Sequence, residues 1–323
     1  MEKLGLVLCG GGTKGAFQVG VWEALEDLGI TEEITGFSGT SIGAVNVALL
    51  LSNANREKKE EIWKSFKQDD MTPPEKIKRA VNPKSHVEEV YNMFDIAING
   101  FFSQEALEER LKELNLDYDE IKNSYDVFTS VTDLSVGHIH SAFIDWKRVP
   151  NQKIKRFIKY SAKLPILNGA HFSGKRLGHL IVDGGLRDFH KVLKPNLSNT
   201  PIAPLYAIGY RKFIVVYLSN KEKMEKQIQK ENEMFLGSEI CRIFDDSSSD
   251  NKFGSFIKID EKITEERIKA GRDKINEIIS NSPNNDLPFE RTKPGNNENT
   301  ISKTEKCIER GYKLVYEKRQ SNL

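Results

Sequence analysis

The chain has 323 residues, which is enough to bury the core of one large α/β domain with additions or of two modest domains. Its 48 Lys and Arg residues balance 47 Asp and Glu residues, and a net charge of +1 excludes a global field that would draw the protein to nucleic acid. Three cysteines lie far apart in no metal-ligand spacing, which favours a reducing compartment without disulfides or a metal site: Cys9, Cys241 and Cys307.

The first fifty residues alternate between predicted strands and helices. Residues 4–9 are almost continuously apolar, which is typical of a strand covered on both faces of a parallel sheet. A glycine turn follows, and apolar residues at helical spacing then predict a helix that ends near Gly29. A second strand ends near Ser38. Residues 41–52 predict a helix that is apolar nearly all round and is therefore buried.

The middle of the chain predicts an insertion followed by a return to strands. Residues 53–122 are charged and strongly helical, so we interpret them as a helical cap inserted into the domain. Residues 125–146 alternate between apolar and polar side chains on both sides of a glycine, which predicts a β-hairpin. Three more elements are expected: a helix over residues 151–164, a strand over residues 179–183, and a last sheet strand over residues 212–219.

The polar remainder predicts a helical extension. We assign residues 1–260 to one main domain, which includes the insertion, and residues 261–323 to a C-terminal helical extension. Within the extension, the Pro- and Asn-rich residues 281–300 are expected to form a linker. A basic amphipathic helix from about residue 301 is expected to pack on the body.

The segment GTSIG at residues 39–43 fits the pattern G-x-S-x-G of a nucleophile elbow. The elbow needs a strand before it and a helix after it, and both are predicted independently. Such an elbow explains why glycine stands on both sides of the serine. The serine backbone is strained, and the strand and the helix pass so close together that a Cβ at either flanking position would collide. Ser41 is therefore a candidate nucleophile, and a helix N-cap serine is the simpler alternative.

The segment GGGTKG at residues 10–15, which we call the glycine loop, has two interpretations. It fits the dinucleotide-binding pattern, but that fold needs an acidic residue at the end of the second strand, where FSGTS stands instead. The better use of consecutive glycines is an oxyanion hole, in which backbone N–H groups face a developing negative charge.

A serine nucleophile needs a base, and Asp183 is the best candidate. Ordinary α/β-hydrolases carry their catalytic histidine after the acid, late in the chain. Here the last histidine is His190, only a few residues after Asp183, and no later strand carries one. Asp183 stands at a predicted strand end before two glycines, and partial desolvation would raise the pKa of its carboxyl toward that of a useful base. The simpler alternative is a turn-forming Asp-Gly pair.

In this order and setting, GGGTKG, GTSIG and DGG resemble the patatin-like phospholipase family. TSVTDLSVGHIHSAF and YSAKLPILNG are similar to that family's middle region, so the resemblance covers about residues 4–220. It implies an α/β fold, a three-layer α/β/α sandwich with a mostly parallel central sheet, a helical cap insertion and C-terminal helices. It also implies lipid acyl hydrolysis with no metal and no cofactor.

The resemblance assigns roles to particular residues. Ser41 is the nucleophile, Asp183 the single general base, and Gly11 and Gly12 the oxyanion donors. Gly10 and Lys14 complete the predicted oxyanion region, where Lys14 matches in charge the arginine usual in the family. The supporting motif glycines are Gly15, Gly39, Gly43, Gly184 and Gly185.

Other residues receive plainer interpretations. Asp188 and His190 stand where the family often has Asn and Pro, and Lys163 replaces an alanine-like position, so all three bear on substrate choice. Asp133 is expected to stabilise a turn. Five of the six histidines are considered as metal ligands and are expected to hold no metal: His138, His140, His171, His179 and His190. An apolar cluster is expected in the core of the cap rather than at a lipid entry: Phe94, Ile96, Ile98, Phe101 and Phe102.

The sequence thus predicts a cytoplasmic lipid acyl hydrolase of the phospholipase A or lysophospholipase type that works through an acyl-enzyme. No stretch approaches the roughly 18 apolar residues that span a bilayer, and residues 4–9 are too few for a signal peptide, so membrane contact is expected to be peripheral. The expected partner is a phospholipid or lysophospholipid, with no nucleic acid. The alternatives are an esterase or thioesterase on soluble acyl compounds, a regulated membrane-damaging defence effector and, outside enzymes, a nucleotide-binding module.

Overall fold

The computed structural model describes residues 3–70, 104–135, 138–162, 180–183, 198–247 and 259–316. The strands in these residues are β1 (Leu4–Leu8), β2 (Ile34–Thr40), β3 (Asp126–Ser135), β4 (His138–Asp145), β5 (Leu180–Asp183), β6 (Lys212–Tyr217), β7 (Glu239–Phe244) and β8 (Glu290–Arg291). They form one eight-stranded sheet in the order β4-β3-β2-β1-β6-β7-β8, and β5 pairs with β3 beside this path. Neighbours from β3 to β7 are parallel, whereas β4, β5 and β8 are antiparallel to their partners.

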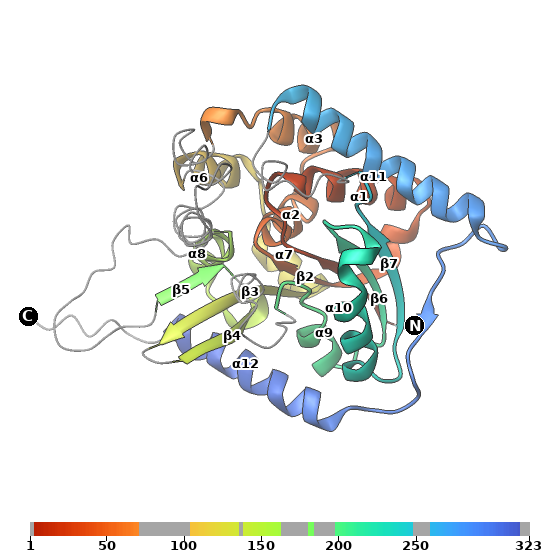
Figure 1. The fold of residues 1–323 in the computed structure, drawn as a ribbon. Coiled ribbons are helices and arrows are strands. Elements are labelled where there is room, and N and C mark those ends of the chain that lie inside the picture. Colours follow the sequence, from red (N-terminus) through yellow and green to blue (C-terminus); the bar gives the residue numbers. More distant parts are fainter. Residues whose placement is uncertain are drawn as a thin grey trace, which may run out of the picture.

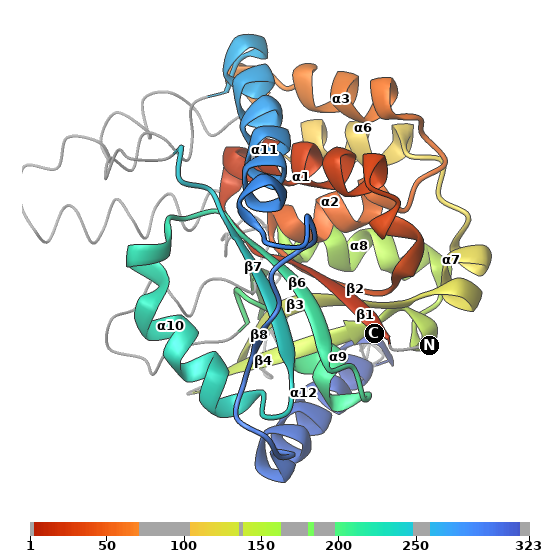
Figure 2. The same cartoon turned by 90° about the vertical axis from the view of Figure 1, so that its right-hand side faces the viewer.

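Helices cover both faces of the sheet (Figure 1), and Figure 2 shows the sheet between the two layers. One layer holds α1 (Ala16–Asp27), α2 (Ile42–Leu50), α3 (Arg56–Lys64), α6 (Gln104–Glu113), α8 (Asn151–Ser161) and α11 (Glu261–Asn281). The other holds α9 (Ala203–Ala207), α10 (Lys221–Met234) and α12 (Glu298–Tyr316), while α7 (Tyr118–Ser124) leads into β3. Short 3-10 turns are η1 (Gly12–Gly15), η2 (Ile30–Glu33), η3 (Gln68–Asp70) and η4 (Trp146–Arg148). This confirms the predicted three-layer α/β/α sandwich with a mostly parallel sheet.

The apolar strands are buried on both faces because each face has its own core. Along β1, Leu6 and Leu8 join the core under α1 and α2, whereas Val7 joins the core on the opposite face. All residues of α2 are buried, as its apolar sequence predicts. Within the described residues, no helix has both the length and the apolar character needed to cross a bilayer.

The sheet continues beyond the strand over residues 212–219 that the sequence predicts as the last. β7 pairs in parallel with β6, and β8 pairs with β7. The prediction missed β7 because two charged side chains interrupt its apolar pattern, Glu239 and Arg242. In the fold the side chain of Arg242 is only 4 % exposed and pairs with Glu231 and Glu290, with N–O distances of 3.5 and 3.1 Å.

Residues after 260 are built into the sandwich. α11 packs along α1 on one face, and α12 packs on β4 and α9 on the other (Figure 1). Between them, the segment predicted as a linker contributes β8 to the sheet edge. The division into a main domain and an extension stays a prediction. α11 contributes Ile268 to the core under α1 and α2, and α12 contributes Ile308 to the core on the opposite face.

The described part of the predicted cap lies in a helical layer. α3 packs against α1 and α11, and α6 packs against α8. The apolar cluster predicted between Phe94 and Phe102 lies outside the described residues, so its place in a cap stays a prediction.

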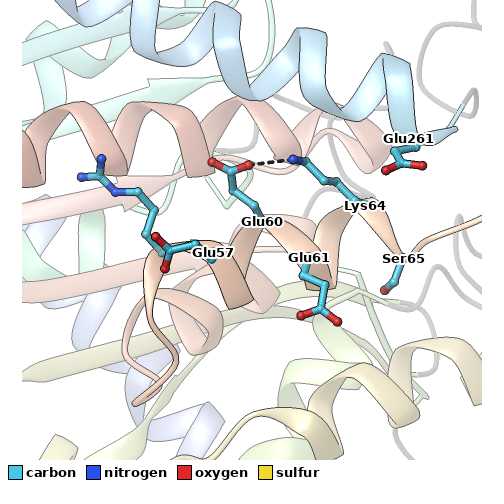
Figure 3. A pocket seen from close by; sticks show the side chains of 7 residues that line it. Glu57, Glu60, Glu61, Lys64, Ser65 and Glu261 are labelled. Carbon is cyan, nitrogen blue, oxygen red and sulfur yellow. Dashed lines mark ion pairs between the residues drawn. The ribbon is translucent and has the colours of Figure 1, made fainter.

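A charged groove of about 430 Å³ runs between α3 and the start of α11 (Figure 3). Glu60 on its wall pairs with Lys64, with 2.9 Å between Nζ and Oε2. Behind the groove, Arg272 Nη1 of α11 lies 3.0 Å from Glu60 Oε1 and 2.6 Å from Oε2 of Glu23 on α1. Glu23 is buried, and its burial together with the nearby Glu60 carboxylate raises its pKa to about 7 against the attraction of Arg272.

We expect Glu23→Gln to gain stability relative to wild type as the pH rises from 5 to 8. The folded state holds a proton on Glu23 that the unfolded chain releases near the ordinary glutamate pKa of 4.5, so wild-type stability falls as the pH rises toward about 7. The loss is at most about 3 kcal/mol, at about 1.4 kcal/mol per pKa unit. Urea unfolding across this pH range measures it, with the exposed Glu26→Gln on the same helix as control. Parallel pH profiles for wild type and Glu23→Gln would contradict the expectation.

Candidate active site

Ser41 occupies a sharp turn between β2 and α2. Its φ of 55° and ψ of −127° lie in a region that L-residues rarely adopt, and it is one of two non-glycine residues with positive φ among those described. It stands at the N-terminus of α2, and its side chain makes no capping hydrogen bond to that helix. The simpler interpretation of Ser41 as a helix-capping side chain therefore has no support in its geometry, because a capping serine accepts from the first-turn amides.

The motif glycines allow the strand, elbow and glycine loop to touch. A Cβ on Gly39 would lie 2.5 Å from the Gly43 carbonyl oxygen, and a Cβ on Gly43 would collide with the Leu8 carbonyl oxygen. On the loop side, a Cβ on Gly10 would lie 3.0 Å from Ser41 Cβ, and one on Gly15 2.5 Å from Ile42 Cγ1. The glycine loop thus lies directly against Ser41.

A buried serine from α8 holds the backbone of the elbow. Ser161 Oγ accepts a hydrogen bond from the Ser41 amide at 2.8 Å and donates to the Ser130 carbonyl of β3 at 2.6 Å. Ser161 is fully buried. This contact spans 120 residues of sequence, so sequence patterns gave no signal for it.

The glycine loop is held at both ends by two buried amide side chains. Gln18 Nε2 of α1 donates to the Cys9 carbonyl at 2.8 Å, just before the loop. Asn46 Nδ2 of α2 donates to the Gly15 carbonyl and to Gln18 Oε1, each at 2.8 Å, and its Oδ1 accepts from the Trp63 indole at 2.9 Å. One network therefore joins the helix that follows Ser41 to both ends of the loop.

Inside the loop, the backbone turns at the predicted oxyanion region. Gly12 has a φ of 59°, which glycine adopts readily. Gly11 lies against Leu218 after β6, where a Cβ would come within 2.6 Å of Leu218 Cβ. No hydrogen bond joins the amides of Gly10 or Gly11 to the backbone of another described residue. The backbone of Gly10 and Gly11 therefore lies against Ser41 and Leu218, and the oxyanion role of the loop stays a prediction.

Lys14 belongs to the glycine loop and is buried, with 4 % of its surface exposed. Burial lowers its pKa to about 8, while Asp245 opposes the shift and Arg267 and Lys223 add to it. Lys14 is therefore charged below about pH 8, within a group of basic side chains from α10 and α11. Its electrostatic role in the oxyanion region stays a prediction.

The backbone of Asp183 ends β5 next to the end of β2. Asp183 pairs with Val131 of β3, and Thr40 pairs with the preceding residue, Ser130. β4 occupies the other edge of β3 over the same residues, so β2 and β5 meet end to end on one edge. The main chains of Thr40 and Asp183 are therefore neighbours along β3, while the side chain of Asp183 lies outside the described part, as do Gly184 and Gly185.

A known protein family matches the part of the chain that holds these elements. The model of the family described as patatin-like phospholipase matches residues 6–194, more than half of the chain. The chain belongs to this family. Its matched region spans the glycine loop, the elbow and β5.

Three relatives illustrate how far the similarity extends. The lysophospholipase nte1 of Aspergillus terreus is 56 % identical over 54 residues, which is 17 % of this chain and 3 % of that protein. The type III effector ExoU shares 15 % identity with a TM-score of 0.44, over 85 % of this chain and 52 % of ExoU. VipD from Legionella pneumophila shares 14 % identity with a TM-score of 0.36, over 84 % of this chain and 67 % of VipD. This patatin-like chain thus spans a small part of the curated relative and about half of ExoU.

The remaining candidate residues are either placed by the structure or lie outside the residues that it describes. Asp133 was predicted to stabilise a turn; it is buried within β3 opposite His140 and Ile181, and the turn role stays a prediction. Among the described residues, no group of His, Cys, Asp or Glu could hold a metal ion. Several predicted residues lie outside the described residues: Lys163, His171, His179, Asp188 and His190. His138 is described only by its backbone, at the start of β4.

Proposed function

We propose that this patatin-like chain is a lipid acyl hydrolase that cleaves fatty-acyl esters of phospholipids or lysophospholipids through Ser41 and Asp183. The observation that carries the proposal is the conformation of Ser41, a strained serine at a strand-to-helix turn pressed against a glycine loop. Family membership and a relative named as a lysophospholipase support the substrate class. The site lies in the cytoplasm under this proposal, and contact with lipid is peripheral.

The proposed reaction has two halves. Asp183 takes the Ser41 proton as Ser41 Oγ attacks the ester carbonyl carbon, and the carbonyl electron pair moves onto oxygen. The tetrahedral intermediate collapses, the C–O bond to the alcohol breaks, and Asp183 returns the proton to that alcohol. Water then attacks the acyl-enzyme with Asp183 again as base, releasing the fatty acid and restoring Ser41.

The glycine loop stabilises the charge that forms on the carbonyl oxygen. Backbone N–H groups of Gly11 and Gly12 are the proposed donors, with Gly10 as their neighbour against Ser41. The positive charge of Lys14 favours an anion nearby while Lys14 is protonated. Loss of one oxyanion donor typically lowers kcat by about 100- to 1000-fold, so the loop carries a large share of the proposed catalysis.

The proposal predicts that Ser41→Ala and Asp183→Asn each lower ester turnover by at least about 1000-fold. Turnover of a phospholipid in mixed micelles and labelling by a fluorophosphonate probe measure the effect, with Ser52→Ala as control. Ser52 is also a buried serine, but it bonds the Leu49 carbonyl at the end of α2. Normal activity in Ser41→Ala or Asp183→Asn would overturn the dyad.

The same assay separates the substrate classes. A lipid hydrolase accelerates when its substrate forms micelles, whereas an esterase or thioesterase on soluble acyl compounds prefers monomers. Turnover confined to monomeric esters would replace the lipid assignment and keep the serine mechanism. Activity that needs an added cell extract would favour the regulated defence effector.

A further inference from the structure

Arg267 of α11 bonds the middle of the glycine loop. Its Nη1 donates to the Thr13 carbonyl at 2.9 Å and lies 2.8 Å from Thr13 Oγ1. Thr13 is fully buried and directly follows the three glycines. One partly buried guanidinium from the C-terminal part of the chain thus bonds both the backbone and the side chain of a loop residue.

The loop needs such restraint because glycines carry the largest backbone entropy of any residue. An oxyanion hole works by preorganisation, since donors already in place require no rearrangement as charge develops. Gln18 and Asn46 hold the two ends of the loop, at Cys9 and Gly15. Between those ends, Arg267 is the described side chain that bonds the carbonyl of Thr13.

The packing of α11 on α1 sets the position of Arg267. Gly271 lies one turn after Arg267 on the same helix face, and a Cβ there would collide with the Phe17 carbonyl of α1. In return, a Cβ on Gly20 of α1 would collide with the Ile268 carbonyl of α11. The two backbones are thus in direct contact one turn from Arg267, which leaves little freedom for α11 to shift along the loop.

We propose that Arg267 is a positioning residue of the oxyanion hole, so that α11, which lies beyond the family-matched residues 6–194, completes the catalytic site. This inference rests on the proposed acyl hydrolase function. It assigns a catalytic part to a helix that the motifs do not include. It also predicts that the matched residues alone lack an ordered loop.

The test compares Arg267→Met and Arg267→Lys with wild type on a soluble p-nitrophenyl fatty-acyl ester, so that lipid binding does not enter. We expect Arg267→Met to lower kcat by about 10- to 100-fold, with KM within about twofold, because the loop amides lose their alignment with the transition state. Fluorophosphonate labelling should slow in parallel. Arg267→Lys should recover part of kcat, since an ammonium can still donate to the Thr13 carbonyl but lacks the planar guanidinium.

A matched control and a second variant separate positioning from folding. Lys262→Met removes another cation of α11, whose side chain is 85 % exposed and lies 3.9 Å from Glu266 of the same helix, and it should leave kcat unchanged. Thr13→Val removes one acceptor while keeping Arg267, and its effect on kcat should be smaller in the Arg267→Met background than in wild type. Additive effects of the two substitutions on kcat would overturn the inference. This comparison remains valid even where Arg267→Met is less stable than wild type.

The outcomes distinguish the two proposals. If wild type turns over ester through Ser41 and Arg267→Met keeps its kcat or changes only KM or the melting temperature, the positioning role fails while the hydrolase stands. If wild type has no turnover, or Ser41→Ala retains it, the proposed function fails and the role of Arg267 fails with it. A selective loss of kcat with partial recovery in Arg267→Lys supports both.

Discussion

Replacing Ser41 by glycine is expected to abolish ester turnover and to raise the free energy of unfolding by about 1 kcal/mol. A non-glycine residue in this part of φ/ψ space costs about 1 to 3 kcal/mol, and Ser41 has a φ of 55° and a ψ of −127°. Glycine adopts the conformation without the penalty of a Cβ, although its larger unfolded-state entropy offsets part of the gain. Activity and stability therefore change in opposite directions at one residue.

Ser41→Ala is the matched comparison for this prediction. Alanine also lacks the hydroxyl but keeps the Cβ, so it should lose activity equally without the gain in stability. Urea unfolding monitored by fluorescence, alongside turnover of a micellar phospholipid, measures both quantities. A glycine variant no more stable than the alanine variant would show that the backbone at residue 41 holds no strain.

The elbow and the loop could be predicted from sequence because each is a local feature. Gly39 and Gly43 flank Ser41 within five residues, and their role, close passage of β2 and α2, depends only on the adjacent elements. The strand and helix on either side are equally local, since their apolar patterns follow from burial on both faces. Such alternating elements indicate an α/β fold, and the resemblance to the patatin-like family implied its three layers.

The supports of the site could not be predicted, because they join distant segments. Ser161 meets Ser41 across 120 residues, and Arg267 meets Thr13 across 254 residues. In the sequence, Ser161 is one serine near a helix end, and Arg267 is one cation on a helix whose exposed residues are largely charged. The burial of Asp133 is also non-local, since it results from the pairing of β3 with β4 and β5 on its two sides.

Gly271→Ala is expected to destabilise the protein by about 3 kcal/mol and to reduce turnover as well. Helix propensity alone predicts the opposite sign, because alanine stabilises a helix interior by about 1 kcal/mol relative to glycine. The opposing effect is steric, since the new Cβ would collide with the Phe17 carbonyl and force α11 away from α1. The sign of the change therefore tests whether the two helix backbones are in contact.

The same displacement moves Arg267, one helical turn away, from Thr13. Gly271→Ala should therefore lower kcat in the folded protein at temperatures well below its melting transition. Lys269→Ala, at an exposed neighbouring position on α11, is the control and should change neither quantity by much. A destabilised Gly271→Ala variant with wild-type kcat would show that α11 supports the fold without aligning the loop, because backbone contact and loop position would then be independent.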